Sequence, residues 1–294
     1  VTSPQADQSV LAGAVLAASG EARDDIALEF VGLDTRRTKP PAGSEAKLAE
    51  PVEEWMEAAR RRPDAGEGDA ASAAAAADAA RRALVETTIE LSGFNLVPGD
   101  ELWISAVAGD TYELDGERHP QSRSPVRRLK VISEEQFTAQ VWAELAAARR
   151  ALLKLDEDQA KLREQMASPD ASAGVERPQA GVTERLANES RALERVQKRI
   201  GENRLKDEEL DGVVQQAADL LARAGESSTQ ASSKAGELAR EPRNEQEDTE
   251  RARRVQAEQD KVRDRVAQAV RLLDRGQDAF AVRRELERLA ARQG

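Results

Sequence analysis

An acidic cluster near the start of the chain has the residue types that suit metal binding best. Glu21, Asp24 and Asp25 lie in a turn-rich stretch just before an alternating strand pattern. Carboxylate oxygens are the ligands that calcium prefers, so Asp24 and Asp25 are the candidate metal ligands. The spacing does not match an EF-hand loop, and a solvated acidic turn that protects an edge strand would use the same residues. Calcium is the only cofactor that the sequence suggests.

The remaining polar residues of the first half do not assemble into a catalytic pattern. Asp100, Asp110 and Asp115 each adjoin a glycine, so turn formation accounts for all three. His119 is the single histidine and precedes Pro120 in a polar loop. Zinc sites and Ser-His-Asp triads need further ligands or a placed nucleophile, which no pattern here supplies. We therefore predict no catalytic residues and no enzymatic activity.

The composition and charge of the chain exclude several kinds of chemistry and of binding partner. The chain of 294 residues has no cysteine, which excludes disulfides and thiol chemistry, and no glycine-rich phosphate-binding motif. The net charge is -11, with 15 basic and 23 acidic residues up to position 132 and 29 basic and 32 acidic residues after it. Neither half is a basic footprint, so we expect no nucleic-acid partner. Trp103 and Trp142 are candidate partner anchors, although burial in a core explains Trp103 more simply.

The apolar period changes near Ser133. Before this residue the apolar side chains alternate, as at Ala83, Val85 and Ile89, which is typical of a strand with one buried face. After it they recur at steps of three and four, which is typical of a helix. Ser133 and Gln136 form a capping-box pattern that predicts where the first helix begins.

These patterns predict an α+β chain with two domains. Residues 1–132 are expected to form an antiparallel, immunoglobulin-like β-sandwich, interrupted at 34–80 by a mobile Ala-rich insertion. Residues 133–294 are expected to form a coiled-coil arm, either a helical hairpin or three helices at about 134–167, 183–224 and 243–291. The stretch 225–241 is rich in glycine and serine and is expected to be a loop.

The helical arm carries an apolar seam that we expect to be its interaction surface, either within one chain or between chains. Asn203 and Asp207 also fall in step with it and are expected to weaken it or to fix its register. The predicted seam residues are Leu145, Leu152, Leu155, Leu193, Ile200, Val262, Val266 and Leu273.

Several short segments, taken in order, resemble one family. Ala22–Leu28 resembles an A-x-D-D-x-G-L signature, with Ala27 at the usual glycine position. It is followed, in this order, by Pro98–Asp100, Ala106–Asp110, Ser122–Ser124 and the stretch from Leu129 to Phe137. This order is similar to large, uncharacterised bacterial membrane-anchored proteins, whose immunoglobulin- or cadherin-like extracytoplasmic domains lead into long Glu/Arg-rich helices. The resemblance implies an extracytoplasmic location and a membrane anchor outside this stretch.

The sequence therefore predicts a non-enzymatic structural or protein-interaction module. Its head would lie outside the cytoplasm, and its helices would serve as a spacer or as an oligomerisation arm that binds protein or a second copy. The alternatives are a calcium- or glycan-binding module at the Asp24 and Asp25 end, an enzyme using head carboxylates such as Asp100 or Asp110, and an adaptor of an export system.

Overall fold

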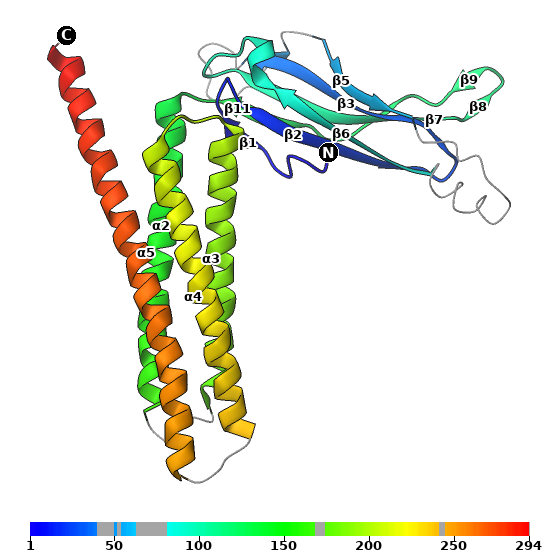
Figure 1. Ribbon diagram of the computed structural model, residues 1–294. Coiled ribbons are helices and arrows are strands. Elements are labelled where there is room, and N and C mark those ends of the chain that lie inside the picture. Colours follow the sequence, from blue (N-terminus) through cyan, green and yellow to red (C-terminus); the bar gives the residue numbers. More distant parts are fainter. Residues whose placement is uncertain (40–49, 52–53, 63–80, 168–173, 241–244, 294) are drawn as a thin grey trace. The chain divides into compact units, whose positions relative to one another are not determined.

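The computed structural model describes every residue except 40–49, 52–53, 63–80, 168–173, 241–244 and 294. Strands come first, and four long helices follow (Figure 1). The chain divides into two compact units. The head unit comprises Val1–Phe137 with Glu202–Arg204, and the helical unit comprises Thr138–Gly201 with Leu205–Gly294.

The head unit is built from a seven-stranded sheet, a two-stranded sheet and a small hairpin. The two-stranded sheet pairs β2 (Val15–Arg23) with β6 (Arg82–Glu90), and the hairpin pairs β8 (Glu113–Leu114) with β9 (Glu117–Arg118). In the large sheet the main order is β1-β11-β7-β3-β4, with β10 beside β7 and β5 beside β3. Its strands are β1 (Gln8–Val10), β3 (Leu28–Lys39), β4 (Glu50–Pro51), β5 (Met56–Arg61), β7 (Glu101–Asp110), β10 (Ser122–Arg123) and β11 (Arg127–Val131).

The apolar side chains that were predicted to alternate along the strands form the core of the head. In β6, Ala83, Val85 and Ile89 are buried, and Leu16 of β2 pairs directly with Ile89. Both sheets contribute to one apolar cluster, in which Leu33 of β3 joins the β2 and β6 side chains. The opposite face of β6 carries Glu86, Thr88 and Glu90, together with Leu84, which is exposed.

Two expectations about the head are wrong. The strands are not all antiparallel, because β1 pairs with β11 in parallel. The region 34–80 is not one insertion, because 34–39 continue β3 and Met56–Arg61 form β5, which pairs with β3. The sequence of β5 is helix-prone, so pairing with a neighbouring strand overrides local propensity here. The Ala-rich stretch 63–80 lies outside the described residues.

The second half contains four helices instead of the two or three predicted. They are α2 (Glu134–Gln165), α3 (Glu176–Glu202), α4 (Glu208–Arg240) and α5 (Glu245–Gln293). The capping box is confirmed, since the Gln136 amide donates to Ser133 Oγ and the Ser133 amide donates to Gln136 Oε1, both at 3.2 Å. Within the helical unit the helices lie side by side (Figure 1).

The predicted helix 183–224 is interrupted where two polar residues fall in step with its seam. Arg204 has a φ of 52°, a left-handed conformation that ends α3. Asp207 then caps the next helix, because its Oδ1 accepts from the Leu210 amide at 3.0 Å. Asn203 Oδ1 accepts from the Leu11 amide at 2.7 Å within the head unit. Asn203 therefore lies at the break between α3 and α4, and Asp207 caps α4. Contrary to the expectation, neither residue weakens a continuous apolar seam.

The Gly/Ser-rich stretch 225–241 was expected to be a loop, but its residues up to Arg240 are helical. Its small side chains lie on the buried face of α4, as at Ser228, Ala231 and Ala235. Small residues let helix backbones approach closely, and among the described helices α4 and α5 have the closest backbones. The composition therefore reflects close packing in a helix.

Candidate functional site

The acidic turn between β2 and β3 does not gather metal ligands. Asp24 Oδ1 accepts from the Asp25 amide at 2.9 Å, which is ordinary turn geometry. Glu21 is engaged instead by Arg23 at 2.9 Å and Arg82 at 2.7 Å, and these hydrogen bonds lower the pKa of its carboxyl. Among the described residues, no group of three or more His, Cys, Asp or Glu side chains could hold a metal ion.

Asp110 and His119 meet at the end of the head, a pairing that sequence analysis missed. His119 Nδ1 lies 2.8 Å from Asp110 Oδ2, and the imidazole stacks on Tyr112 with ring centroids 4.2 Å apart. The hydrogen bond to His119 lowers the pKa of Asp110, assisted by the Tyr112 amide. The two residues flank the β8–β9 hairpin, whose turn residues Asp115 and Gly116 have positive φ. No nucleophile accompanies the pair among the described hydrogen bonds, so we assign it a role in fixing the hairpin.

Asp100 has a structural role. It is 4% exposed, and its Oδ2 accepts from Arg37 Nη2 at 2.8 Å and from the Val97 amide at 3.2 Å. The hydrogen bond to the Val97 amide stabilises the turn before β7, while the ion pair joins that turn to β3.

Substitution of Arg37 by Met is expected to destabilise the head by about 3 kcal/mol, because it removes one partner of a buried ion pair and leaves Asp100 without a countercharge. Urea unfolding followed by tryptophan fluorescence would measure this loss. The matched control is Arg23→Met, which breaks the exposed pair with Glu21 and is expected to cost less than about 1 kcal/mol. Equal losses in the two variants would contradict a structural role for the Arg37–Asp100 pair.

A row of alternating arginine and tryptophan side chains crosses the face of the large sheet that points away from the core. Trp103 of β7 pairs across the sheet with Arg36 of β3 on one side and Arg128 of β11 on the other. Each guanidinium carbon lies 5.2 Å from the Trp103 ring centroid. Arg36 also lies 4.6 Å from the ring of Trp55, and Arg123 lies 4.3 Å from that same ring. We call these five residues the arginine–tryptophan row.

Trp103 is buried, as expected of a core residue, but it lies outside the apolar cluster that the two sheets share. Its neighbours Leu102 and Ile104 are members of the apolar cluster, and successive side chains of a strand point to opposite faces. Trp103 is still only 9% exposed, because the flanking arginines cover its ring. Its indole Nε1 donates to Glu101 Oε2 at 2.8 Å, which fixes the orientation of the ring.

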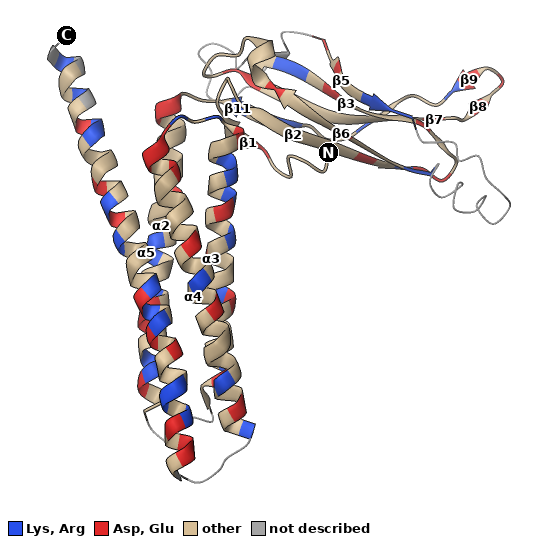
Figure 2. Ribbon diagram, in the orientation of Figure 1, with Lys and Arg blue, Asp and Glu red and all other residues tan. Residues whose placement is uncertain are grey.

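Part of the charge in this region is neutralised. Asp34 accepts from Arg123 at 2.7 Å and lies 3.8 Å from Arg60, which also pairs with Glu57 at 3.1 Å. Figure 2 shows acidic and basic residues on the strands of the head unit. Arg36 and Arg128 differ from Arg60 and Arg123, since neither side chain pairs with a carboxylate among the described residues. Two carboxylates do lie nearby, since Glu101 accepts from the Trp103 indole and Asp7 Oδ1 accepts from the Arg128 amide at 2.9 Å. Among the described residues, the two arginines that cover Trp103 are therefore without an ion-pair partner but not remote from acidic groups.

The predicted seam lies inside the helical unit. Leu152, Val262 and Val266 are fully buried, and the other five members are at most 3% exposed. Outside this core, acidic and basic side chains are interleaved along the four helices (Figure 2), which is typical of solvated helix faces. The buried members are Leu145, Leu152, Leu155, Leu193, Ile200, Val262, Val266 and Leu273.

A layer of polar side chains interrupts this apolar core, with one contributor from each helix. Gln159 of α2, Gln179 of α3, Ser228 of α4 and Gln259 of α5 are all fully buried. Gln159 and Gln179 exchange two hydrogen bonds of 3.0 Å. Gln179 also donates to Ser228 Oγ at 2.9 Å and accepts from Gln259 Nε2 at 3.0 Å. We call these four residues the polar layer.

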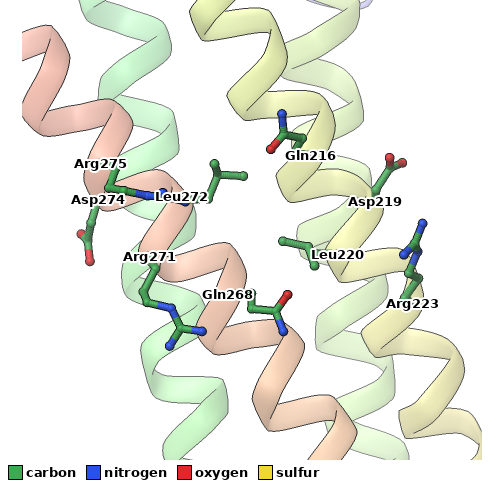
Figure 3. Close-up of a pocket in the computed structure, with 9 residues that line it drawn as sticks. All are labelled: Gln216, Asp219, Leu220, Arg223, Gln268, Arg271, Leu272, Asp274 and Arg275. Atoms are coloured by element: carbon green, nitrogen blue, oxygen red, sulfur yellow. The ribbon is translucent and has the colours of Figure 1, made fainter.

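An open groove of about 700 Å³ lies between α4 and α5. Leu220 and Leu272 point into the space between the helices (Figure 3), and the rest of the lining is mostly charged or amide side chains. Asp274 pairs with Arg149 of α2 and is not free for chemistry in the groove. The groove holds no arrangement of nucleophile and base, so it does not indicate an active site.

Trp142, the other candidate anchor, is buried in the helical unit. It is 7% exposed and stacks on Phe280 with ring centroids 5.5 Å apart. A Cβ at Gly276 would come within 2.6 Å of its ring, so this glycine of α5 leaves room for the indole. Trp142 is therefore a packing residue within the helical unit.

No family model, curated protein or solved structure matches the chain. None of the helices in the described parts of the chain is long and apolar enough to cross a membrane.

Proposed function

We propose that this chain is a non-enzymatic module in which the helical unit is a self-contained spacer and the head unit carries the interaction surface. The observation that carries the proposal is that all eight residues of the predicted seam are buried within one chain. A seam that is already covered is not available for a partner helix. In this proposal the helices have the left-handed packing of a coiled coil, and the head is an immunoglobulin-like sandwich.

The extracytoplasmic location stays part of the proposal. It is supported by the similarity of the head and of the start of α2 to bacterial membrane-anchored proteins with such domains. Nothing in the described residues points to a catalytic centre, since the polar clusters are turn, hairpin or ion-pair arrangements. We therefore place recognition, not catalysis, on the head.

Sedimentation and thermal unfolding at several protein concentrations test the spacer role. We expect a monomer whose melting temperature does not depend on concentration, because an intrachain core is formed without mass action. A mass that rises with concentration, together with a rising melting temperature, would contradict a self-contained spacer.

One observation favours the second candidate, an oligomerisation arm. Near the end of α5, Val282, Leu286 and Leu289 are 61%, 62% and 45% exposed and recur at steps of four and three. Such a stripe is typical of a helix that pairs with another. If the chain self-associates, the variant with serine at these three positions is expected to be monomeric. The matched control is Leu153→Ser, which removes a 39% exposed leucine from α2.

A further inference from the structure

We propose that the arginine–tryptophan row binds an acidic polypeptide segment that carries two carboxylates about 10 Å apart. This inference rests on the proposed function of the head as an interaction surface, and it names the chemistry of the partner. The contacts would be made by Arg36 and Arg128, on either side of Trp103.

The two guanidinium groups are oriented but not neutralised. Each covers the Trp103 ring, and a stacked guanidinium keeps the N–H donors at its edge free for a carboxylate. The Nε of Arg36 is buried and has no hydrogen-bond partner among the described residues. Neighbouring Arg123, in contrast, is already paired with Asp34. Because the Nε of Arg36 is buried, a carboxylate would bind the Nη edge of the guanidinium, which stacking on the ring leaves preorganised.

Charge complementarity favours a polypeptide over a nucleic acid. The chain has a net charge of -11, and acidic residues outnumber basic ones in its first 132 residues, so this charge opposes every anionic ligand in proportion to the ligand's charge. A polyphosphate backbone carries many charges and needs a long basic track, whereas two carboxylates need only two cations. Two isolated guanidinium groups instead match two carboxylates. A peptide with two acidic side chains can reach both guanidinium groups without the many further charges of a polyphosphate.

The strand register sets the spacing of those carboxylates. Arg128 and Arg36 lie on β11 and β3, the two neighbours of β7, so they are two interstrand distances apart. Neighbouring strands are separated by about 4.8 Å, which puts the two positions about 10 Å apart. An extended peptide advances about 3.3 Å per residue, and its side chains alternate between two faces. Two glutamates on the same face are therefore separated by one or three intervening residues, which puts their Cα atoms about 7 or about 13 Å apart, and their flexible side chains cover the remaining difference.

The test is a titration of the full chain with capped Gly/Ser peptides that contain two glutamates separated by zero to six residues. Binding is followed by NMR through the indole N–H resonance of Trp103, identified with Trp103→Phe. We expect saturable shifts with a submillimolar Kd, strongest at one or three intervening residues, weaker at two, and weakened by 0.5 M NaCl. The double variant R36Q/R128Q is expected to raise the Kd at least tenfold.

The matched control is R23Q/R82Q, which removes the same charge from the two-stranded sheet and is expected to leave the Kd unchanged. If R36Q/R128Q is unfolded, R128Q alone serves, with a smaller loss expected. Absence of binding, binding without a preferred spacing, or equal losses in the two double variants would overturn the proposal. Binding of a sulfated glycan or an oligonucleotide at Arg36 and Arg128, in place of the peptides, would overturn the partner class alone. The sedimentation result of the proposed function is independent of all these outcomes.

Discussion

Leu152→Asp is expected to unfold the helical unit. Leu152 is fully buried among the four helices, and a carboxylate there would lose its hydration without gaining a countercharge. The cost is about 5 kcal/mol, which is comparable to the whole stability of a domain of this size. Circular dichroism at 222 nm should show most of the helical signal lost, while the strand signal of the head remains.

The adjacent residue provides a stringent control for this prediction. Leu153 is 39% exposed on the same helix, so Leu153→Asp adds the same charge to a solvated face. It is expected to change the free energy of unfolding by less than about 0.5 kcal/mol. If both variants keep full helicity, the assignment of Leu152 to the core is wrong.

Gln179→Leu is expected to be the next most damaging substitution, at about 3 kcal/mol. Gln179 is the hub of the polar layer, and its removal leaves the amides of Gln159 and Gln259 and the hydroxyl of Ser228 without this buried partner. Each unsatisfied buried group costs about 1 to 3 kcal/mol. Urea unfolding followed by circular dichroism would measure the sum.

Two further variants separate hydrogen bonding from packing in the polar layer. Gln216→Leu changes an exposed glutamine of α4 and should alter stability by less than about 0.5 kcal/mol. The triple variant Q159L/Q179L/Q259L removes the amides together and should recover much of the stability lost by the single change. A neutral effect of Gln179→Leu alone would show that the layer contributes no net stability.

The polar layer shows what the sequence could and could not predict. In α2 the apolar residues Leu155 and Leu162 are seven positions apart, and Gln159 occupies the step between them. The periodicity therefore places a glutamine in the core of α2. It does not show that Gln179, Ser228 and Gln259 occupy the same level of the other helices, because that depends on how the helices are aligned.

The break between α3 and α4 was not predicted, because apolar periodicity does not show where a helix ends. Ile200, Asn203, Asp207 and Leu210 keep the three-and-four spacing, so the apolar pattern alone favours one continuous helix. The positive φ of Arg204 and the cap by Asp207 are local features that periodicity does not record. In contrast, the capping box at Ser133 was predicted correctly, because both of its partners are close in sequence.

The sequence also could not show on which face of the large sheet the Trp103 side chain lies. From Leu102 to Val107 every residue of β7 is buried, so the strand has no polar alternation that separates one face from the other. Only the packing of Leu102 and Ile104 in the apolar cluster shows which face meets the core, and only the register of β7 with β3 and β11 shows which arginines flank Trp103. The basic members of the row are scattered over three strands and form no motif in the sequence.

The parallel pairing of β1 with β11 has a consequence for the order in which the chain folds. Gln8 pairs with Leu129, so the head cannot close its sheet until almost all of its residues are available. Closing so long a loop costs entropy before any contact is gained, and such non-local pairings fold slowly. The closest helix pair, α4 and α5, is consecutive in the chain, so these helices can pack without closing a long loop. Helices are therefore expected to form before the first strand finds its partner, so during folding the N-terminal residues are the last part of the head to become protected.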